Sequence, residues 1–395
     1  MSYRRIVVVG NGIAGQTACD ALRSGGFDGE LTVVGAEPHR PYSRPALSKA
    51  LLRGGDNLSA HELPPPTHGA LELLGETAAG LDPRARVIRL GGGGELPYDG
   101  LVIASGSSAR RLGPSDDDGA GQELTLRTFE DALRLKKLAA GRPAVAVVGG
   151  GPLGMEVASG CLEAGCRVTL VSDGPPLARH LGGYLADIFV GAATRLGLRI
   201  VSGGRAALER SEAGTRVLLA DGRRVEADLV VTAAGDIPNT GWLAGSGLLT
   251  NGSLRVDSRG RVRPDIVAAG DVAVFPTGRG HARVPLWMSA IDQAKVAGAG
   301  LLRGREAPEL AFQPYFWTEA FGLALKSVGF MPAKGAPDDV ERGPEEDSRL
   351  LWWGSPSGTG AGTAVSINYR IPVPGLRRLA NQGPAVPRPP VHAPR

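Results

Sequence analysis

Val7-Val-Val-Gly-Asn-Gly-Ile-Ala-Gly15 is an apolar run that leads directly into the pattern G-x-G-x-x-G. Where such a loop joins a strand to a helix, it lets the backbone approach a pyrophosphate and hold it at the helix N-terminus. The stretch Val147-Val-Gly-Gly-Gly-Pro-Leu-Gly154 repeats the pattern well inside the chain. One loop of this kind indicates a nucleotide site, and two indicate a pair of sites.

The context of the two loops decides their interpretation. A lone G-x-G-x-x-G is a weak signal, because tight strand-to-helix turns are common in a chain with 59 glycines. Here each loop follows an apolar run that predicts a buried strand and precedes a predicted helix, which is the context that supports the motif. The first unit has predicted strands at 6–9 and 31–34 around a helix at 14–24, and the second has strands at 145–148, 167–171 and 229–235.

Each unit has its own candidate acid for the ribose of a dinucleotide. Glu37 stands just past the second strand of the first unit, at about the separation where a carboxylate reaches a ribose hydroxyl. In the second unit the corresponding position is Ser172, with Asp173 beside it. Asp173 can accept from a ribose diol, which favours NADH. The alternative is NADPH, whose additional phosphate would be bound by Ser172 with Arg179 or His180.

Length and composition limit the class of protein. A chain of 395 residues exceeds what one core supports, so we expect several domains. A net charge of +4 is too diffuse to indicate nucleic-acid binding. Because no apolar run is long enough to cross a bilayer and the N-terminus lacks a signal-peptide pattern, we expect a cytoplasmic protein without membrane association. Cys19, Cys161 and Cys166 form no C-x-x-C pair and the histidines lack metal-ligand spacing, so we expect neither disulfide nor metal chemistry.

Six short motifs follow one another along the chain. They are Gly10-x-Gly-x-x-Gly15, Pro41-Tyr-Ser-Arg-Pro-Ala-Leu-Ser-Lys49, Ala104-Ser-Gly106, Gly149-x-Gly-x-x-Gly154 with Glu156, Asp236-Ile-Pro-Asn239 and Ala268-Ala-Gly-Asp271. This order resembles that of the FAD-dependent pyridine nucleotide oxidoreductases. Over nearly the whole chain apart from the tail, the closer resemblance is to their ferredoxin reductase branch, and Pro314-Tyr-Phe-Trp-Thr-Glu319 is similar to the start of that branch's C-terminal domain.

The resemblance implies an α/β fold with two Rossmann-like dinucleotide-binding domains, for FAD and for NAD(P), and a C-terminal α+β domain. The FAD domain is discontinuous, with residues 1–113 and 241–308, and the NAD(P) domain at 114–240 is inserted into it. Residues 309–382 form the C-terminal domain, whose aromatic and alternating segments at 312–317, 323–328, 349–353 and 363–369 are typical of the strands of a small, mostly antiparallel sheet. The proline-rich tail at 383–395 is expected to be disordered.

The resemblance also implies a flavin site. Lys49 is expected near the N5 edge of the flavin and paired with Glu156, because an ammonium there stabilises negative charge on reduced flavin and a buried lysine needs a carboxylate partner. These two are the candidate catalytic residues. Asp271 would accept from ribityl hydroxyls, and Trp287 and Trp317 would border the flavin or, alternatively, lie in the core. The other candidate cofactor contacts are Gly10, Gly12, Ile13, Ala14, Gly15, Glu37, Arg44, Ala104, Ser105 and Gly106 for FAD, and Gly149, Gly151, Leu153, Gly154, Asp173 and Gly235 for the nicotinamide dinucleotide.

Some positions depart from the branch. Pro152 stands where a bulky residue is usual, Ser105 replaces a threonine and Ser172 replaces an acid. Two of these three departures fall in the nicotinamide half. The disulfide reductases of the superfamily carry a cysteine pair where this chain has the stretch ending at Lys49, so the resemblance implies direct electron transfer from the flavin to an acceptor.

Together these features predict an FAD-dependent NAD(P)H:ferredoxin-type reductase. Hydride would pass from NADH to FAD, and single electrons would then pass to a small iron–sulfur protein. Two alternatives stay open at this point. One is a flavoprotein that acts on a small molecule or oxygen in a biosynthetic pathway, and the other is a flavin-binding redox-signalling protein that resembles apoptosis-inducing factor. The sequence identifies neither the acceptor nor the oligomeric state, for which a homodimer is one option.

Overall fold

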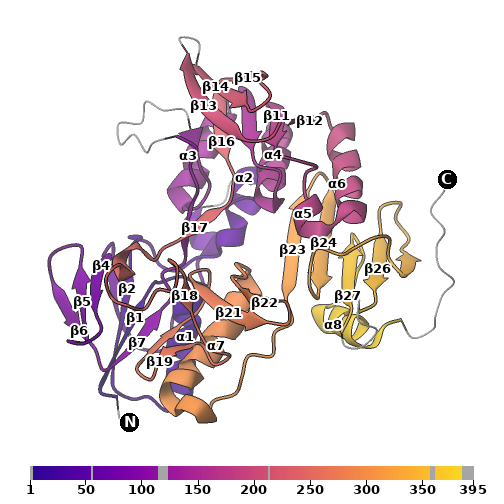
Figure 1. Cartoon of the computed structure of the whole chain (residues 1–395). Helices are drawn as coiled ribbons and strands as arrows, with labels where there is room; N and C mark the ends of the chain where they lie inside the picture. Colours follow the sequence, from indigo (N-terminus) through magenta and orange to yellow (C-terminus); the bar gives the residue numbers. More distant parts are fainter. Residues whose placement is uncertain (1–2, 55–56, 114–122, 212–213, 356–360, 385–395) are drawn as a thin grey trace. The chain divides into compact units, whose positions relative to one another are not determined.

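The computed structural model of the protein describes residues 3–54, 57–113, 123–211, 214–355 and 361–384 (Figure 1). The chain forms two compact units. Unit 1 comprises Met1–Ser43, Leu58–Ser108 and Ile237–Phe312, and unit 2 comprises Arg44–Asn57, Ala109–Asp236 and Gln313–Arg395. The division into three domains expected from the sequence stays a prediction, and most of the expected tail, at 385–395, lies outside the described residues.

Unit 1 is built on a six-stranded sheet. Its strand order is β19 (Arg261–Arg263), β20 (Ile266–Ala268), β7 (Gly100–Ile103), β1 (Arg5–Val9), β2 (Glu30–Gly35) and β3 (Leu71–Leu74). Neighbouring strands run in parallel, except β19 and β20, which are antiparallel. The main helices of the unit are α1 (Ile13–Ser24) and α7 (Trp287–Arg303).

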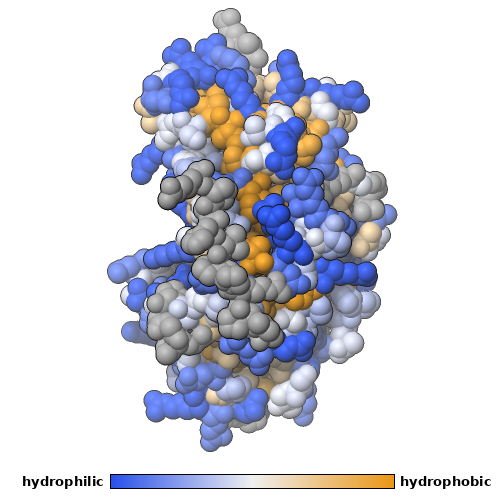
Figure 2. All heavy atoms as spheres, turned by 90° about the vertical axis from the view of Figure 1, so that its right-hand side faces the viewer, coloured by the Kyte–Doolittle hydropathy of each residue, from blue (hydrophilic) through white to orange (hydrophobic). Residues whose placement is uncertain are grey.

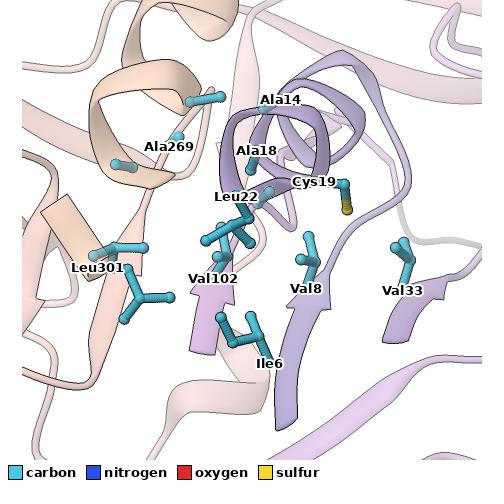
Figure 3. Packing of buried hydrophobic residues seen from close by; sticks show 14 of the residues in the cluster. Ile6, Val8, Ala14, Ala18, Cys19, Leu22, Val33, Val102, Ala269 and Leu301 are labelled. Carbon is cyan, nitrogen blue, oxygen red and sulfur yellow. The ribbon is translucent and has the colours of Figure 1, made fainter. Parts of the chain in front are cut away.

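Alternate residues of β1 point to opposite faces of this sheet. Ile6 and Val8 are fully buried in a cluster with Leu22 of α1 and with residues of α7 (Figure 3). Val7 and Val9 lie in a second cluster that includes Ile88 of β5 (Val87–Leu90), a strand of a separate antiparallel sheet. Both faces of the sheet are therefore covered, as a parallel sheet requires, and the end of β1 is held between two cores.

Smaller elements complete unit 1. A three-stranded antiparallel sheet contains β4 (Ala78–Asp82), β5 (Val87–Leu90) and β6 (Glu95–Pro97). Another three-stranded sheet contains β18 (Leu254–Arg255), β21 (Ala273–Thr277) and β22 (Gly280–Ala282). The short helices are η2 (Leu58–His61), η3 (Gly241–Leu243) and η4 (Gly304–Glu306), and β8 (Ser107–Ala109) pairs with β17 (Asp236–Pro238) where the chain passes between the units.

Unit 2 contains a second parallel sheet. Its order is β12 (Arg199–Ser202), β11 (Arg167–Ser172), β10 (Ala144–Val148), β16 (Leu229–Thr232) and β9 (Glu123–Leu124). The helices in the first two segments of unit 2 are η1 (Arg44–Ala46), α2 (Ala50–Arg53), α3 (Phe129–Ala139), α4 (Pro152–Glu163), α5 (Ala178–Leu181) and α6 (Gly183–Arg195). An antiparallel sheet of β13 (Ala206–Ser211), β14 (Gly214–Leu219) and β15 (Arg224–Ala227) shares a hydrophobic cluster with it.

The C-terminal part of unit 2 is a five-stranded antiparallel sheet. Its order is β23 (Tyr315–Ala320), β24 (Leu323–Val328), β27 (Thr363–Ile367), β26 (Arg349–Trp353) and β25 (Asp339–Arg342). Helix α8 (Val373–Gln382) packs on it through Leu376 and Ala380. On the face drawn in Figure 2, hydrophilic side chains (blue) predominate at the surface.

Most predicted elements agree with the structure. The strands and helices expected around both glycine loops are confirmed, as is the antiparallel character of the C-terminal sheet. The strand expected at 312–317 is wrong by three residues, because β23 covers Tyr315–Ala320, where its side chains alternate between the two faces of the sheet. Helices α3, α6 and α8 are not predicted from the sequence pattern.

Candidate functional site

The first glycine loop joins β1 to α1 in unit 1. Gly10 has a φ of +115°, and a β-carbon there would lie 2.0 Å from the carbonyl oxygen of Ala104. A β-carbon on Gly15 would lie 1.9 Å from the carbonyl oxygen of Gly10. Glycine is therefore required at both positions, by the left-handed backbone at Gly10 and by the close packing of α1 on the loop at Gly15.

Gly12, between these two positions, leaves space for a ligand. It is the N-cap of α1 with a φ of −88°, and a β-carbon there would meet no described atom within 4 Å. Among the described residues no side chain caps α1, and its first turn contains no acid. Because uncapped amides and the helix dipole attract a negative charge, the loop fits the diphosphate of FAD.

The predicted ribose acid lies just beyond β2. Tyr42 Oη donates a hydrogen bond to Glu37 Oε2 at 2.5 Å. Because Tyr42 is buried, this bond holds the carboxylate in one orientation. The sequence pattern does not indicate this role for Tyr42, although the residue lies inside one of the six motifs.

Residues Ala104, Ser105 and Gly106 follow β7 and contact the segment at Asn239. Ser105 Oγ donates to the carbonyl oxygen of Asn239 at 2.9 Å, and Asn239 Nδ2 donates to the carbonyl oxygen of Ser105 at 2.8 Å. Two motifs that are distant in the sequence therefore lie side by side in unit 1. The hydroxyl of Ser105 is thus part of the contact between these two segments.

Asp271 lies beyond β20 and is half-buried. Ser107 Oγ donates to Asp271 Oδ2 at 3.3 Å. The neighbouring Gly270 donates its N–H to Oε1 of Gln293, a fully buried residue of α7, at 2.9 Å. Gln293 thus fixes the backbone next to Asp271, and no sequence motif indicates it. Trp287, another candidate, is the half-buried first residue of the same helix.

The second glycine loop, in unit 2, repeats the geometry of the first. Gly149 has a φ of +126°, and a β-carbon there would lie 2.2 Å from the carbonyl oxygen of Ala233. A β-carbon on Gly154 would lie 1.9 Å from the carbonyl oxygen of Gly149. Gly151 is the N-cap of α4 and Pro152 is the first residue of that helix. Since proline has no N–H, this loop offers an anion one amide fewer than the first loop does.

Lys49 and Glu156 form an ion pair within unit 2. Lys49 Nζ lies 2.9 Å from Glu156 Oε2, and the two side chains are 13% and 6% exposed. Glu156 comes from the first turns of α4, and Lys49 immediately precedes α2. The two side chains therefore pair as expected, and their part in catalysis stays a prediction.

Comparison with known proteins agrees with this geometry. Residues 4–297 match the family model described as pyridine nucleotide-disulphide oxidoreductase. The chain belongs to this family. The protein is accordingly an FAD-dependent pyridine nucleotide oxidoreductase, and its fold with two dinucleotide-binding domains is as expected.

Similar proteins place this oxidoreductase in the ferredoxin reductase branch. It is 36% identical to the ferredoxin–NAD(+) reductase component of the p-cumate 2,3-dioxygenase system of Pseudomonas putida, over 82% of this chain and 81% of the relative. It is 31% identical to the corresponding component of the biphenyl dioxygenase system of Paraburkholderia xenovorans (strain LB400), over 88% and 85% of the two chains. The solved covalent complex of putidaredoxin reductase with putidaredoxin is 26% identical with a TM-score of 0.82, over 96% and 93% of the chains.

The groups that would distinguish NADH from NADPH in this oxidoreductase lie around the end of β11. Arg179 Nη2 lies 2.5 Å from Asp173 Oδ2, and both side chains are exposed. Ser172 is buried and donates its hydroxyl to the carbonyl oxygen of Gly174 at 2.6 Å. Desolvation of the imidazole and the nearby Arg179 guanidinium both lower the pKa of His180. His180 therefore carries less positive charge near neutral pH than an unperturbed histidine does.

Three further candidates lie in unit 2. Trp317 of β23 is half-buried, and its ring stacks on that of Tyr315 with the centroids 5.8 Å apart. Arg44 Nη1 donates to the carbonyl oxygen of Arg127 at 2.7 Å. Gly235 has a φ of +99°, in the left-handed region that favours glycine. Their contacts with cofactors stay predictions.

The cysteines of this oxidoreductase are buried and free. Burial raises the pKa of Cys161 to about 12, so that its thiol is protonated at neutral pH.

Within the described parts of the chain, no group of three or more His, Cys, Asp or Glu side chains is placed to hold a metal ion. Over the same residues, no helix combines the length and the apolar character needed to span a membrane.

A chain of polar side chains supports Asn11 of the first glycine loop. Gln16 Nε2 donates to Asn11 Oδ1 at 2.5 Å and to Glu72 Oε1 at 2.9 Å. Gln16 Oε1 lies 2.9 Å from His68 Nε2, and His68 Nδ1 accepts from the N–H of Ala70 at 3.1 Å. These contacts assign the imidazole proton to Nε2. A second proton, on Nδ1, would oppose the N–H of Ala70.

Acid should therefore loosen unit 1 around the FAD loop. Burial lowers the pKa of His68 from 6.5, Arg23 acts in the same direction, and Asp20 and Glu72 oppose it. His68 therefore binds a proton more readily in the unfolded chain than in the folded one. Its contribution to the free energy of unfolding is complete above pH 6.5 and is lost as the pH falls below this value. As the pH is lowered from about 7.5 to about 5.5, the temperature at which flavin fluorescence appears should decrease. The fall should be smaller in His68→Gln, whose side chain stays neutral, and equal falls in both proteins would contradict this role.

Proposed function

We propose that this oxidoreductase accepts hydride from NADH and delivers single electrons, by way of FAD, to a small iron–sulfur protein of the ferredoxin type. The observation that carries the proposal is the presence in one chain of two glycine loops with the same geometry. A two-electron donor and a one-electron acceptor need a flavin between them, and each dinucleotide needs its own loop. Two similar proteins support it by name, a ferredoxin–NAD(+) reductase component and a reductase solved with putidaredoxin.

FAD, when bound, supplies the conversion from two-electron to one-electron chemistry. The amides that follow Gly12 would bind its diphosphate, because they have no cap among the described side chains. Glu37, oriented by Tyr42, would accept from the adenosine ribose. Lys49 would supply positive charge to the flavin ring, with Glu156 keeping the ammonium ionised.

NADH is the proposed donor because an acid stands beside the ribose position of the second loop. Asp173 can accept from a ribose diol and would repel a phosphate. Its ion pair with Arg179 is exposed, so the carboxylate can exchange this partner for a ribose hydroxyl at little cost. NADPH should accordingly reduce the flavin more slowly than NADH does.

One experiment tests the proposal and separates it from the alternatives. Purified protein loaded with FAD is mixed anaerobically with NADH or NADPH, and flavin absorbance is followed before ferredoxins are added. Rapid bleaching by NADH followed by reduction of a ferredoxin would support the proposal. Reoxidation by oxygen but by no ferredoxin would favour an oxidase, and slow bleaching with a long-lived charge-transfer complex would favour a signalling protein. A protein that takes up no FAD would overturn all three readings.

Two finer expectations stay predictions. The first is the homodimer, which light scattering of the FAD-loaded protein would detect. The second is the cytoplasmic location, which fractionation of the producing cells would test.

A further inference from the structure

The carboxylate of Glu156 accepts hydrogen bonds from three side chains of unit 2. Its Oε2 atom accepts from Lys49 Nζ at 2.9 Å and from the hydroxyl of Ser48. Its Oε1 atom accepts from Thr318 Oγ1 at 2.6 Å. A carboxylate has about four acceptor positions, so three donors satisfy most of them. Bonds of this kind, with an ionised acceptor, are among the strong ones in proteins.

The two hydroxyl donors are buried more deeply than the ion pair itself. Ser48 and Thr318 are 4% and 1% exposed, so water cannot readily replace either of them. Thr318 lies in β23, where a branched side chain has few rotamers and its hydroxyl is held in place. Ser48 is the neighbour of Lys49 in sequence, and both donate to the same oxygen atom.

Lys49 depends on this arrangement for its own position. Its ammonium also donates to the carbonyl oxygen of Pro45 at 3.4 Å, close to the limit of a hydrogen bond. The ammonium of a lysine is carried on a flexible stem of four carbons, so without a fixed carboxylate it would sample many positions. The orientation of Glu156 therefore determines where the positive charge of Lys49 lies.

We propose that Thr318 and Ser48 are positioning residues, which hold the Glu156 carboxylate against the Lys49 ammonium and thereby set how fast NADH reduces the bound flavin. This inference rests on the proposed function. It assigns a role in the reaction to the C-terminal sheet, because Thr318 belongs to that sheet while Glu156 belongs to the helix of the second glycine loop.

Other contacts keep the same elements together when either hydroxyl is removed. The N–H of Phe321, just after β23, donates to Ser159 Oγ of α4 at 2.8 Å. A β-carbon on Gly160 of α4 would lie 3.2 Å from Leu52 Cδ1, so α2 also packs closely on this helix. Removal of one hydroxyl should therefore leave the elements in place and change mainly the orientation of Glu156.

The test compares Thr318→Val, which keeps the shape and removes the hydroxyl, with Thr318→Ser, which keeps the hydroxyl. Anaerobic stopped-flow mixing with NADH should show flavin reduction about tenfold slower in Thr318→Val and in Ser48→Ala, as expected for loss of one bond to a charged group. Thr318→Ser should restore the wild-type rate. The midpoint potential of the bound flavin, measured by dithionite titration, should become more negative in Thr318→Val and return in Thr318→Ser.

Two controls separate positioning from a general loss of structure. Thr363→Val removes a buried hydroxyl from β27 of the same sheet, where it donates to a backbone carbonyl, and should change neither the rate nor the potential. In a Lys49→Met background, Thr318→Val should slow reduction no further, because it acts through Lys49. Equal slowing in both backgrounds, or an unchanged rate and potential in Thr318→Val, would overturn the inference. A wild-type protein that NADH does not reduce would overturn the proposed function instead, and the dithionite potentials would still test Thr318.

Discussion

Replacement of Gly12 by alanine should give a folded protein that binds FAD about a hundredfold more weakly than the wild type. A methyl group at this position would displace the diphosphate from two or more backbone amides. The backbone at Gly12 has a φ of −88°, which alanine adopts without strain, and a β-carbon would meet no described atom within 4 Å. The substitution therefore leaves the protein intact and fills only the space for the ligand. Fluorescence titration of the apoprotein with FAD, alongside thermal unfolding of the apoprotein, measures the two effects separately.

Matched glycines provide the controls for Gly12. Gly151 is the equivalent N-cap in the second loop, with a φ of −81°, and its nearest neighbour would be an exposed side chain, His180, at 3.3 Å. Gly151→Ala should keep FAD and weaken NADH. Gly15→Ala should instead destabilise the apoprotein, because its β-carbon would lie 1.9 Å from the backbone of Gly10. Normal FAD affinity in Gly12→Ala would mean that the diphosphate does not lie beside this residue.

The parts of the fold that depend on local pattern could be predicted from the sequence. Each glycine loop has an apolar strand before it and a helix after it, and the structure has β1 with α1 and β10 with α4 in those places. The short strands β4, β5 and β6 are not predicted, because none of them has the continuous apolar run of β1 or β10, and Leu81 and Ile88 are buried by packing with residues of the main sheet. Such tertiary contacts override weak local preferences.

The residues of the candidate site also fall into two groups, those that the sequence indicates and those that only the fold brings together. Glycines and acids at fixed spacing, such as Gly10 and Glu37, are visible in the sequence because the chemistry of a dinucleotide fixes their distance along the chain. The residues that hold them are not visible. His68 lies 52 residues from its partner Gln16, and Thr318 lies 162 residues from Glu156. Only the fold brings such pairs together. A single threonine such as Thr318 does not indicate a site in a sequence, because threonine is common in strands of every kind.

Replacement of Lys49 by methionine should leave FAD bound and slow flavin reduction by NADH about a hundredfold, the usual effect of removing one electrostatic stabiliser. Methionine fills nearly the same volume without the charge. Since reduced flavin gains negative charge, loss of the ammonium raises the free energy of the product and of the transition state that leads to it. Stopped-flow absorbance under anaerobic conditions measures the rate, and the visible spectrum of the purified variant measures the FAD content.

The same substitution leaves Glu156 buried without its ion partner, so stability must be controlled. An unpaired buried charge costs several kcal/mol, roughly 3–5, although the hydroxyls of Ser48 and Thr318 still donate to this carboxylate. The double variant Lys49→Met with Glu156→Gln removes the unpaired charge and should recover the melting temperature while the rate stays low. If the double variant recovers the rate as well, the slow reduction in Lys49→Met came from the stranded carboxylate. Wild-type kinetics in Lys49→Met itself would remove Lys49 from the mechanism, because the charge would then have no effect on the step that it is proposed to assist.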